Sequence, residues 1–297
     1  MATGINGAWS AYRQCAATSA FHKSQLELFT KASLWLGIAG AVLGTLAQFV
    51  HPNPTSVTAR ALGIAGSLAV ALAGLAATQA VSGDKEKLWI RCRAAGEALK
   101  SAVYLYSASV PPFDAPDRGV ALGQRVERAL RDLDGIALRP GKPDKPPPES
   151  LNAAGYIAAR VDDQIDYYTR SANKYQKKAD FWRYCALAGA ATSTGLAVVS
   201  AMFSLSPWVA LLATVTASIT AYVKNHRYEL MIGLYQATAM RLQSLKDQWL
   251  DSGKTDSGKT DRDAFIQRCE ETLALENGAW VAQWSQQRAQ QEEAGRQ

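Results

Sequence analysis

Hydrophobic residues are concentrated in two long stretches that carry almost no charge. The first, residues 32–83, is interrupted only by His51, by Pro52-Asn53-Pro54 and by Arg60. The second, residues 184–223, contains no charged residue. A bilayer core takes about 20 apolar residues per helix, so each stretch has the length of two spans. We therefore expect four transmembrane helices, at residues 32–50, 57–83, 184–203 and 207–223.

The basic residues near these stretches lie on one side of the expected membrane. The two turns hold almost no basic residues. Those that precede the first and third spans or follow the second and fourth are Arg13, Lys23, Lys31, Lys85, Lys87, Arg91, Arg93, Arg170, Lys174, Lys177, Lys178, Arg183, Lys224 and Arg227. The positive-inside rule then places the N-terminus, the middle segment and the C-terminus in the cytoplasm. The alternative, two buried hairpins of a large soluble helical protein, leaves this distribution unexplained.

The two halves of the chain repeat the same order of parts, which is helix, two spans, helix. Residues 31–35 align with residues 178–182, and after the hairpins residues 94–99 fall on residues 237–242. Five prolines within residues 139–148 exclude a helix there and favour an extended spacer. We therefore expect two domains, residues 1–138 and 150–297, joined by a proline-rich linker at residues 139–149.

Outside the spans, apolar residues recur at helical spacing. Ile157, Val161, Ile165 and Tyr168 share one face before the third span. Helices that run unbroken into the spans, as the lack of Gly and Pro around residues 180–184 and 222–228 permits, would be about 40 to 50 residues long, some 60 to 75 Å. The expected fold is an all-α membrane protein of two tandem helix–hairpin–helix repeats, four transmembrane helices in all, whose long cytoplasmic helices form a stalk or bundle.

The sequence offers little support for an enzyme. Residues 253–260, GKTDSGKT, satisfy the phosphate-binding P-loop pattern, but that loop needs a preceding strand, and the pattern predicts a helix at residues 242–250. The match arises because the pentapeptide DSGKT occurs twice in residues 251–260. Cysteines and histidines are scattered, at Cys15, Cys92, Cys185, Cys269, His22, His51 and His226. We expect reduced thiols, no metal, no cofactor and no catalysis.

The net charge of +6 is most simply explained by the membrane arrangement. A cytoplasmic leaflet rich in anionic lipid attracts basic segments next to the spans. No basic helix or aromatic RNA platform accompanies this charge, so we expect no nucleic-acid partner.

Candidate pore-lining groups lie in the fourth span and at the start of the second. Thr214 and Ser218 share one stripe, Thr216 and Thr220 another, and Arg60 lies about one turn inside the second span. Hydroxyls in lipid often bond only to their own helix, and Arg60 could instead reach the outer interface. Four spans enclose no useful channel, so a pore requires a homo-oligomer. Glycines such as Gly40 and Gly44 allow close helix approach, either between copies or within one protomer.

A candidate cytoplasmic ligand or gating surface combines cations with aromatic rings close to the membrane. Trp89, Arg93 and Glu97 follow the second span, and Arg227 and Tyr228 follow the fourth. The alternative role for these residues is helix packing and lipid anchoring, as it is for Trp280 and Trp284 of the last helix.

Dispersed residues at set distances from the spans carry a family resemblance over nearly the whole chain. In the first half they are residues 9–20, Trp89, Arg93, Ala94, Glu97, Lys100, Ser101 and Pro112-Phe113; in the second half they are Tyr156, Arg160, Val161, Gln164, Tyr167, Tyr168, Tyr235, Arg241-Leu242, Trp249, Glu271, Glu276 and Trp280. Each half resembles a branch of the SLATT family, the two-transmembrane effector domains associated with SMODS nucleotidyltransferases and SLOG ligand sensors in bacterial conflict systems.

The resemblance implies a membrane effector that perforates the bacterial inner membrane when a nucleotide-based alarm is raised, for example in antiphage defence. The partners it implies are the lipid bilayer, further copies of the chain, and either a nucleotide second messenger or a separate sensor protein. An oligomeric channel gated through the cytoplasmic helices is the leading hypothesis. A membrane-anchored scaffold or sensor without its own pore is the alternative. A membrane enzyme would need clustered catalytic groups, which the spans lack.

Overall fold

The computed structural model describes residues 4–50, 56–80, 83–141, 146–200, 203, 205–253 and 258–294. Every regular element within these residues is a helix, which confirms the predicted all-α class. The chain divides into two compact units. The first unit consists of Met1–His22, Asp84–Ala172 and Gly233–Gln297, and the second of Lys23–Gly83 and Asn173–Ile232. Each unit thus takes residues from both halves of the sequence.

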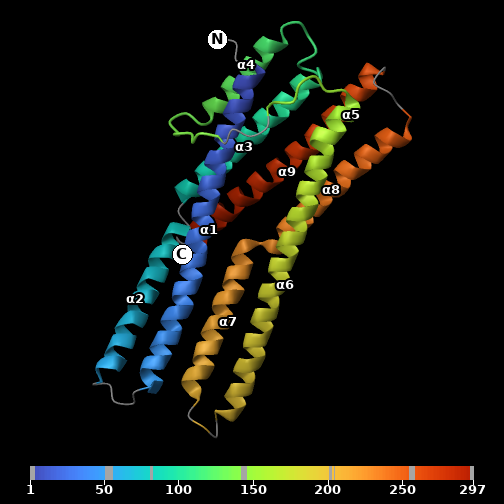
Figure 1. Ribbon diagram of the computed structural model, residues 1–297. Helices are drawn as coiled ribbons and strands as arrows, with labels where there is room; N and C mark the ends of the chain where they lie inside the picture. Colours follow the sequence, from blue (N-terminus) through green and yellow to red (C-terminus); the bar gives the residue numbers. More distant parts are fainter. Residues whose placement is uncertain are drawn as a thin grey trace. The chain divides into compact units, whose positions relative to one another are not determined.

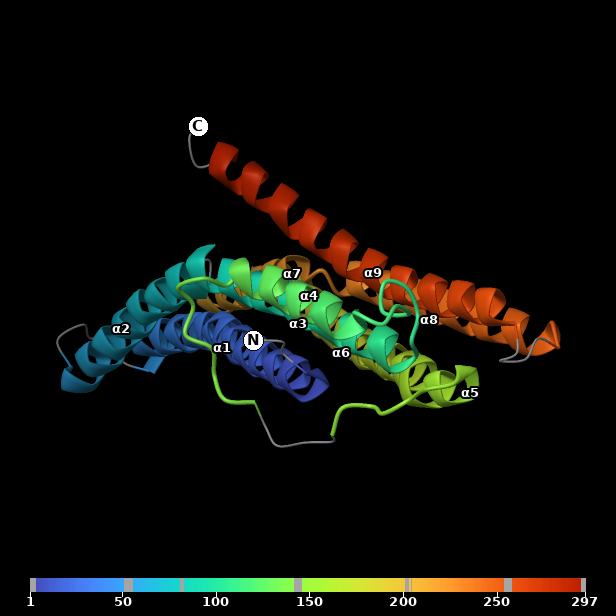
Figure 2. The same ribbon diagram turned by 90° about the horizontal axis from the view of Figure 1, so that it is seen from above.

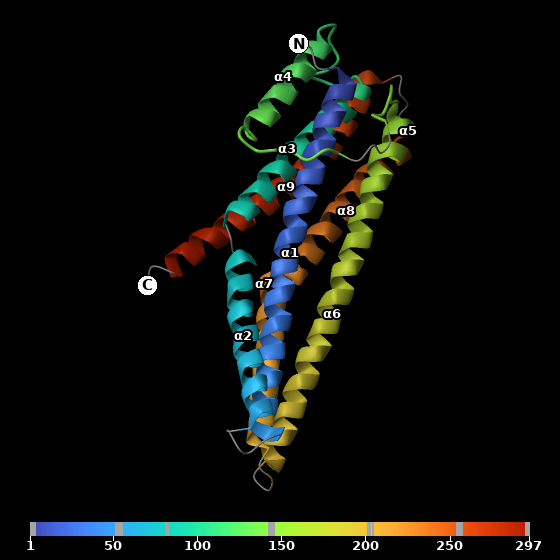
Figure 3. The same ribbon diagram turned by 60° about the vertical axis from the view of Figure 1, so that its left-hand side comes forward.

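The second unit contains the apolar stretches. Its helices are α1 (Ile5–Val50) from Lys23 onward, α2 (Val57–Ala80), α6 (Asp162–Val199) from Asn173 onward, α7 (Ser206–His226) and the start of α8 (Tyr228–Asp251). Within this unit α2 lies alongside α1, and α7 lies alongside α6 (Figures 1 and 3). The first predicted turn lies within residues 51–55, which are outside the described residues, as are residues 201–202 and 204 before and within the second predicted turn.

The ends of these helices follow from local chemistry. Ser56 caps α2, because its Oγ accepts the backbone N–H of Ala59 at 3.1 Å. Pro207 stands in the first turn of α7, where its missing N–H costs nothing. Arg227 has left-handed backbone angles, φ 45° and ψ 42°, and ends α7. The expectation of an unbroken helix through residues 222–228 is therefore wrong, whereas α6 does run unbroken through residues 180–184.

Two glycines bring α1 and α2 into close contact. A Cβ atom on Gly66 would lie 3.1 Å from the carbonyl oxygen of Gly40 and 3.1 Å from the backbone nitrogen of Gly44. A Cβ atom on Gly40 would likewise meet Val70 and the backbone of Gly66. The G-x-x-x-G pair thus packs within one protomer, the second of the two roles expected for it.

Large apolar side chains cover the outside of the second unit. Ile64, Leu68 and Leu75 of α2 are 69%, 58% and 64% exposed, and Leu187 and Val198 of α6 are 60% and 73% exposed. Soluble proteins rarely expose such continuous apolar surface, whereas lipid-facing helices require it.

Three helical stretches of the described residues are long and apolar enough to cross a membrane: Ile5–Phe49, Val57–Ser107 and Ser206–Asp251. They include the first, second and fourth expected spans. The third expected span, residues 184–203, lies in α6 as far as Val199, and residues 201–202 of this span lie outside the described part of the chain. The chain is therefore a multi-pass membrane protein.

The first unit is built like a water-soluble domain. It contains the start of α1, then α3 (Gly83–Ser107), α4 (Arg118–Arg131), α5 (Ala153–Tyr156), the π-helical turn η1 (Ile157–Val161), most of α8, and α9 (Lys259–Ala294). α9 returns alongside α8 (Figures 1 and 2), where the rings of Trp249 and Phe265 stack with centroids 5.0 Å apart. Fully or almost fully buried apolar residues form its core: Leu99, Val103, Phe113, Leu122, Tyr156, Tyr235, Leu242 and Ile266.

Both described ends of the proline-rich linker are fixed to the first unit. At one end the Arg139 backbone N–H donates to Thr18 Oγ1 at 2.8 Å, and the Arg139 guanidinium lies 3.6 Å from the centre of the Phe21 ring. At the other end Ser107 Oγ donates to the Pro148 carbonyl oxygen at 2.7 Å. The predicted spacer is therefore a strap attached to α1 and α3; residues 142–145 lie outside the described part.

Candidate functional site

A shallow groove of about 610 Å³ runs along α6 and α7 in the second unit. It is lined mainly by alanine and hydroxyl residues: Ala190, Ser193, Thr194, Ala213, Thr216, Ala217, Thr220, Ala221 and Lys224. The predicted stripe of Thr216 and Thr220 therefore lies in this groove, whereas Thr214 and Ser218 are not among its lining residues.

The predicted pore-lining hydroxyls differ in their hydrogen bonds. Thr214 donates to the carbonyl of Ala210 at 2.9 Å, Ser218 to Thr214 at 2.8 Å, and Thr220 to Thr216 at 2.9 Å. Such bonds within one helix let a hydroxyl face lipid at little cost. Thr216 Oγ1 is buried without a hydrogen-bond partner among the described residues, which makes Thr216 the one member of the set whose hydroxyl still needs a donor or acceptor.

Arg60 lies at the very start of α2. Its side chain is exposed, and its backbone N–H donates to the Ser56 carbonyl oxygen at 3.1 Å. A guanidinium in the first turn of a span can extend to the membrane surface, as the snorkelling alternative requires. Its place in a pore mouth stays a prediction.

The residues of the predicted cytoplasmic surface fall in both compact units. Trp89, Arg93 and Glu97 belong to the first unit, and Arg227 and Tyr228 to the second. Trp89 is buried, with its carbonyl oxygen 3.5 Å from Ser19 Oγ, so its ring is a packing group in this structure. Tyr228 is also buried, and its ring centroid lies 5.9 Å from that of Tyr175. A ligand or gating role for these residues stays a prediction.

A buried ion pair organises the core of the first unit. Arg160 of η1 is almost fully buried and binds Glu270 of α9 through both carboxylate oxygens, at 2.9 and 3.1 Å. Tyr156 adds a third hydrogen bond, donating to Glu270 at 2.9 Å. Burial by itself would lower the pKa of Arg160, but the Glu270 carboxylate outweighs this and raises that pKa. The Arg160 guanidinium is therefore charged at every physiological pH.

A second buried carboxylate connects α3, α6 and α9. Glu276 accepts the hydroxyl of Tyr168 at 3.1 Å and lies 3.4 Å from the Arg93 guanidinium. Burial raises the pKa of Glu276, against the opposing effects of Arg93 and of the hydrogen bond from Tyr168. Burial also raises the pKa of Tyr168, so this phenol remains a donor. Arg93, predicted to contact a ligand, is committed here to Glu276.

Sequence reasoning did not single out Glu270 or the role of Arg160. A signal was present, because Ile266, Cys269 and Leu273 form an apolar face on α9, and Glu270 and Glu276 lie on or beside that face. Charged residues within an apolar face are rarely fully buried unless they are paired. Their partners lie more than 100 residues away, so the pairing itself needed the structure.

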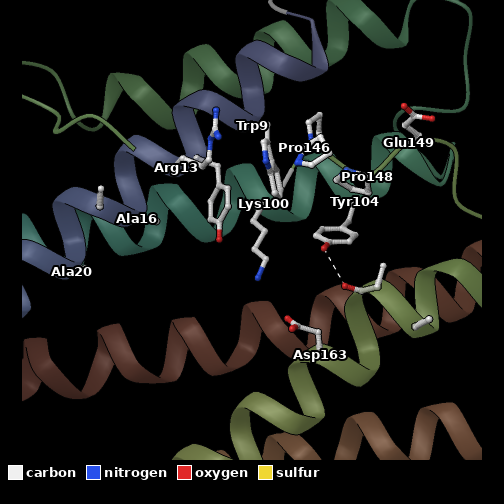
Figure 4. A pocket seen from close by; sticks show the side chains of 15 residues that line it. Trp9, Arg13, Ala16, Ala20, Lys100, Tyr104, Pro146, Pro148, Glu149 and Asp163 are labelled. Carbon is white, nitrogen blue, oxygen red and sulfur yellow. Dashed lines mark hydrogen bonds between the residues drawn. The ribbon is translucent and has the colours of Figure 1, made fainter. Parts of the chain in front are cut away.

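The first unit also contains a pocket of about 1060 Å³ (Figure 4). Its walls come from α1, α3, the end of the linker and the η1–α6 turn. The lining residues are Trp9, Tyr12, Arg13, Ala16, Ala17, Ala20, Lys100, Tyr104, Pro146, Pro147, Pro148, Glu149, Ala158, Ala159 and Asp163. No cluster of residues suited to hold a metal ion occurs within the described ranges.

Comparison with protein families divides the chain in two. Residues 156–280 match the family SLATT_1, described as SMODS and SLOG-associating 2TM effector domain 1. Residues 8–120 match a family described as a protein of unknown function, DUF4231. No curated protein and no solved structure matches the chain. Residues 156–280 are therefore similar to SLATT_1, a class of two-transmembrane effector domain associated with SMODS and SLOG, and the predicted SLATT-like character of the first half is not confirmed.

Proposed function

We propose that the protein is an oligomeric channel or pore-forming effector of the bacterial inner membrane, acting in a conflict system such as antiphage defence. The observation that carries this proposal is the SLATT_1 match, which covers all of α6 and α7 and is described as a two-transmembrane effector. The exposed apolar surface of the second unit supports it, because that surface needs lipid or another protein copy.

The proposed topology has both termini in the cytoplasm and two hairpins spanning the bilayer. Aromatic pairs support it, since such rings favour the two membrane interfaces. The rings of Trp182 and Tyr222 lie 5.2 Å apart near the expected cytoplasmic side, and those of Phe49 and Trp208 lie 5.4 Å apart beside the expected outer turns. In this proposal the first half is a second SLATT-like domain, in tandem with the SLATT_1 domain.

Assembly would rest on small residues that one protomer leaves uncovered. Cβ atoms built on Gly37, Gly63 and Gly74 meet nothing within 4 Å. These positions allow a second copy to approach closely, as pore formation by a four-span chain requires. In such a homo-oligomer the groove along Thr216 and Thr220 would face water, and the Thr216 hydroxyl, which is buried without a hydrogen-bond partner among the described residues, would gain one there.

Gating is proposed to act through the cytoplasmic helices without catalysis. The trigger would be either a nucleotide second messenger or a separate sensor protein, since the SLATT_1 description associates these domains with SMODS and SLOG. The buried pairs Arg93–Glu276 and Arg160–Glu270 are discrete contacts that such a trigger could stabilise or break.

Ion flux through liposomes that contain the purified protein tests the proposal. We expect dye release or ion flux from vesicles with the wild-type protein, with or without added nucleotide, and a change of rate in Thr216→Val. Ala217→Val, a neighbouring groove residue without a hydroxyl, controls for bulk. Well-folded oligomers that pass no ions under any condition would contradict the pore.

That last outcome would favour a membrane-anchored scaffold or sensor without its own pore. One observation supports this second candidate: the hydroxyls of Thr214, Ser218 and Thr220 are already satisfied by their own helix and need no water.

A further inference from the structure

The pocket of the first unit combines an aromatic wall with room for a flat ring. The ring of Trp9 lies 4.8 Å from that of Tyr12 and 6.4 Å from that of Tyr104, measured between centroids. Alanines on α1 and η1, such as Ala16 and Ala159, leave the space beside this wall open. The volume of about 1060 Å³ is at the upper end of the range for small-molecule sites, roughly 300–1,000 Å³.

The aromatic wall is held in place from behind. The hydroxyl of Tyr104 donates to the carbonyl of Ala159 at 3.1 Å, and the Arg160 guanidinium lies 4.9 Å from the centre of the Tyr104 ring. Arg160 is itself fixed by Glu270. Tyr104 therefore presents a preformed surface. Stacking of a ligand there costs little conformational entropy, because the Tyr104 side chain is already ordered.

Opposite charges face the same space from two sides. Lys100 of α3 and Asp163 of α6 point into the pocket (Figure 4), yet no ion pair within 4.0 Å joins them. Asp163 accepts a hydrogen bond from its neighbour Gln164 at 3.0 Å, and Lys100 Nζ lies 5.8 Å from the centre of the Tyr12 ring. Burial and nearby Arg160 lower the pKa of Lys100, so an anion bound beside it would relieve an unfavourable environment.

We propose that this pocket binds a nucleoside phosphate, with the base against the aromatic wall of Trp9 and Tyr104, the phosphate at Lys100, and amino or hydroxyl donors at Asp163. Each part of the ligand matches one feature of the lining. The flat ring matches the aromatic wall, the anion matches Lys100, and the hydrogen-bond donors match Asp163. Arg13 also lines the pocket, but its guanidinium points away from Lys100 and Asp163 (Figure 4).

The site belongs to neither half of the chain alone. Trp9, Lys100 and Tyr104 lie in the part that matches DUF4231, and Ala159 and Asp163 in the part that matches SLATT_1. The strap residues 146–149 close the wall between them. A bound ligand would thus connect the two halves, and this inference deepens the proposed function, on which its gating role rests.

Calorimetric titration of the detergent-solubilised full chain tests the site without reference to flux. The probes are the four common nucleoside 5′-monophosphates, with adenosine as the probe that lacks the anion and ribose 5-phosphate as the probe that lacks the ring. We expect binding of at least one monophosphate, and at least tenfold weaker binding of both truncated probes.

Lys100→Met should weaken that binding about 10- to 100-fold, the value of a hydrogen bond to a charged group. Lys100→Arg should largely restore it, and Asp163→Asn should weaken it less. Lys87→Met, at an exposed position of the same helix, is the matched control and should bind like the wild type. Because Lys100→Met removes a half-buried charge, it should keep the wild-type melting temperature or raise it.

Two results would overturn the site: no binding of any monophosphate to the folded wild-type chain, or equal binding by wild type and Lys100→Met. The proposed function can fail separately. A chain that binds the nucleotide but never conducts ions would support this site and contradict the pore. Conversely, ion flux without nucleotide binding would support the pore and contradict the site.

Discussion

At the scale of single residues, the first unit depends on a few buried charges. A buried guanidinium and carboxylate lose their hydration. Their electrostatic attraction offsets this desolvation cost only when the geometry of the pair is good and its remaining hydrogen bonds are made. Arg160 and Glu270 meet the geometric part of that condition through two hydrogen bonds, with Tyr156 adding a third, whereas Arg160 Nη1 is buried without a hydrogen-bond partner among the described residues. Removing one partner leaves the other as an uncompensated charge in an apolar core.

We expect Glu270→Leu to lower the free energy of unfolding by about 3–5 kcal/mol, because Arg160 is then left buried without its carboxylate. The double variant Arg160→Met/Glu270→Leu should recover most of this loss. Denaturant unfolding of the detergent-solubilised protein, followed by circular dichroism, measures both. Glu127→Gln breaks the exposed Arg131–Glu127 pair, 3.6 Å, and should cause no measurable change. Equal effects of Glu270→Leu and Glu127→Gln would contradict the assignment.

At the scale of elements, much of the fold could be predicted from residue patterns. Uncharged stretches of span length predict α1, α2 and α7, because apolar length is a local property. The break between α7 and α8 could not be predicted in this way. It occurs at Arg227, which has left-handed backbone angles although the sequence shows neither glycine nor proline there.

Packing between helices likewise could not be predicted from local sequence patterns. The sequence shows Gly40, Gly63 and Gly66 as equivalent small residues, yet only the structure tells which of them meets a neighbouring helix. Gly66 lies against the backbone of α1, whereas a Cβ on Gly63 would meet open space. The candidate site has the same dependence: Lys100 and Asp163 reach one pocket only after the two halves fold together.

We expect Gly66→Ala to destabilise the α1–α2 contact by about 1–3 kcal/mol, because the added Cβ would lie 3.1 Å from backbone atoms of Gly40 and Gly44. Gly63→Ala, one turn earlier on the same helix, should leave stability unchanged or raise it slightly. Thermal unfolding in detergent compares the two. If both alanines behave alike, the close approach of α1 and α2 is not present in the protein.

At the scale of the whole molecule, the compact units run across the two halves of the sequence. Arg93 of the first half pairs with Glu276 of the second, and Tyr104 donates to Ala159. The predicted domains, residues 1–138 and 150–297, describe the repeat in the sequence and stay a prediction at that level. The units could not be predicted from the repeat, because pairing across the halves depends on contacts between distant residues.

We expect the chain split in the linker, as residues 1–141 and 142–297, to assemble only when both fragments are produced together. Each fragment alone lacks half of the core of the first unit and should aggregate. Affinity purification through a tag on one fragment, with the other detected in the eluate, measures assembly. Arg93→Leu, which leaves Glu276 without its cation, should reduce the recovery of the second fragment. Two fragments that fold stably apart would contradict the interleaved units.

The pairing of Arg93 with Glu276 also has a consequence in time. The two residues are 183 positions apart. At synthesis rates of roughly 5–20 residues per second, the ribosome delivers the carboxylate roughly 10 to 40 s after the guanidinium. Throughout that interval the first two apolar helices, α1 and α2, are already made while the first unit is incomplete. The nascent chain therefore depends on chaperones or on the translocon to hold Arg93 and its neighbours in solution until the last helix emerges.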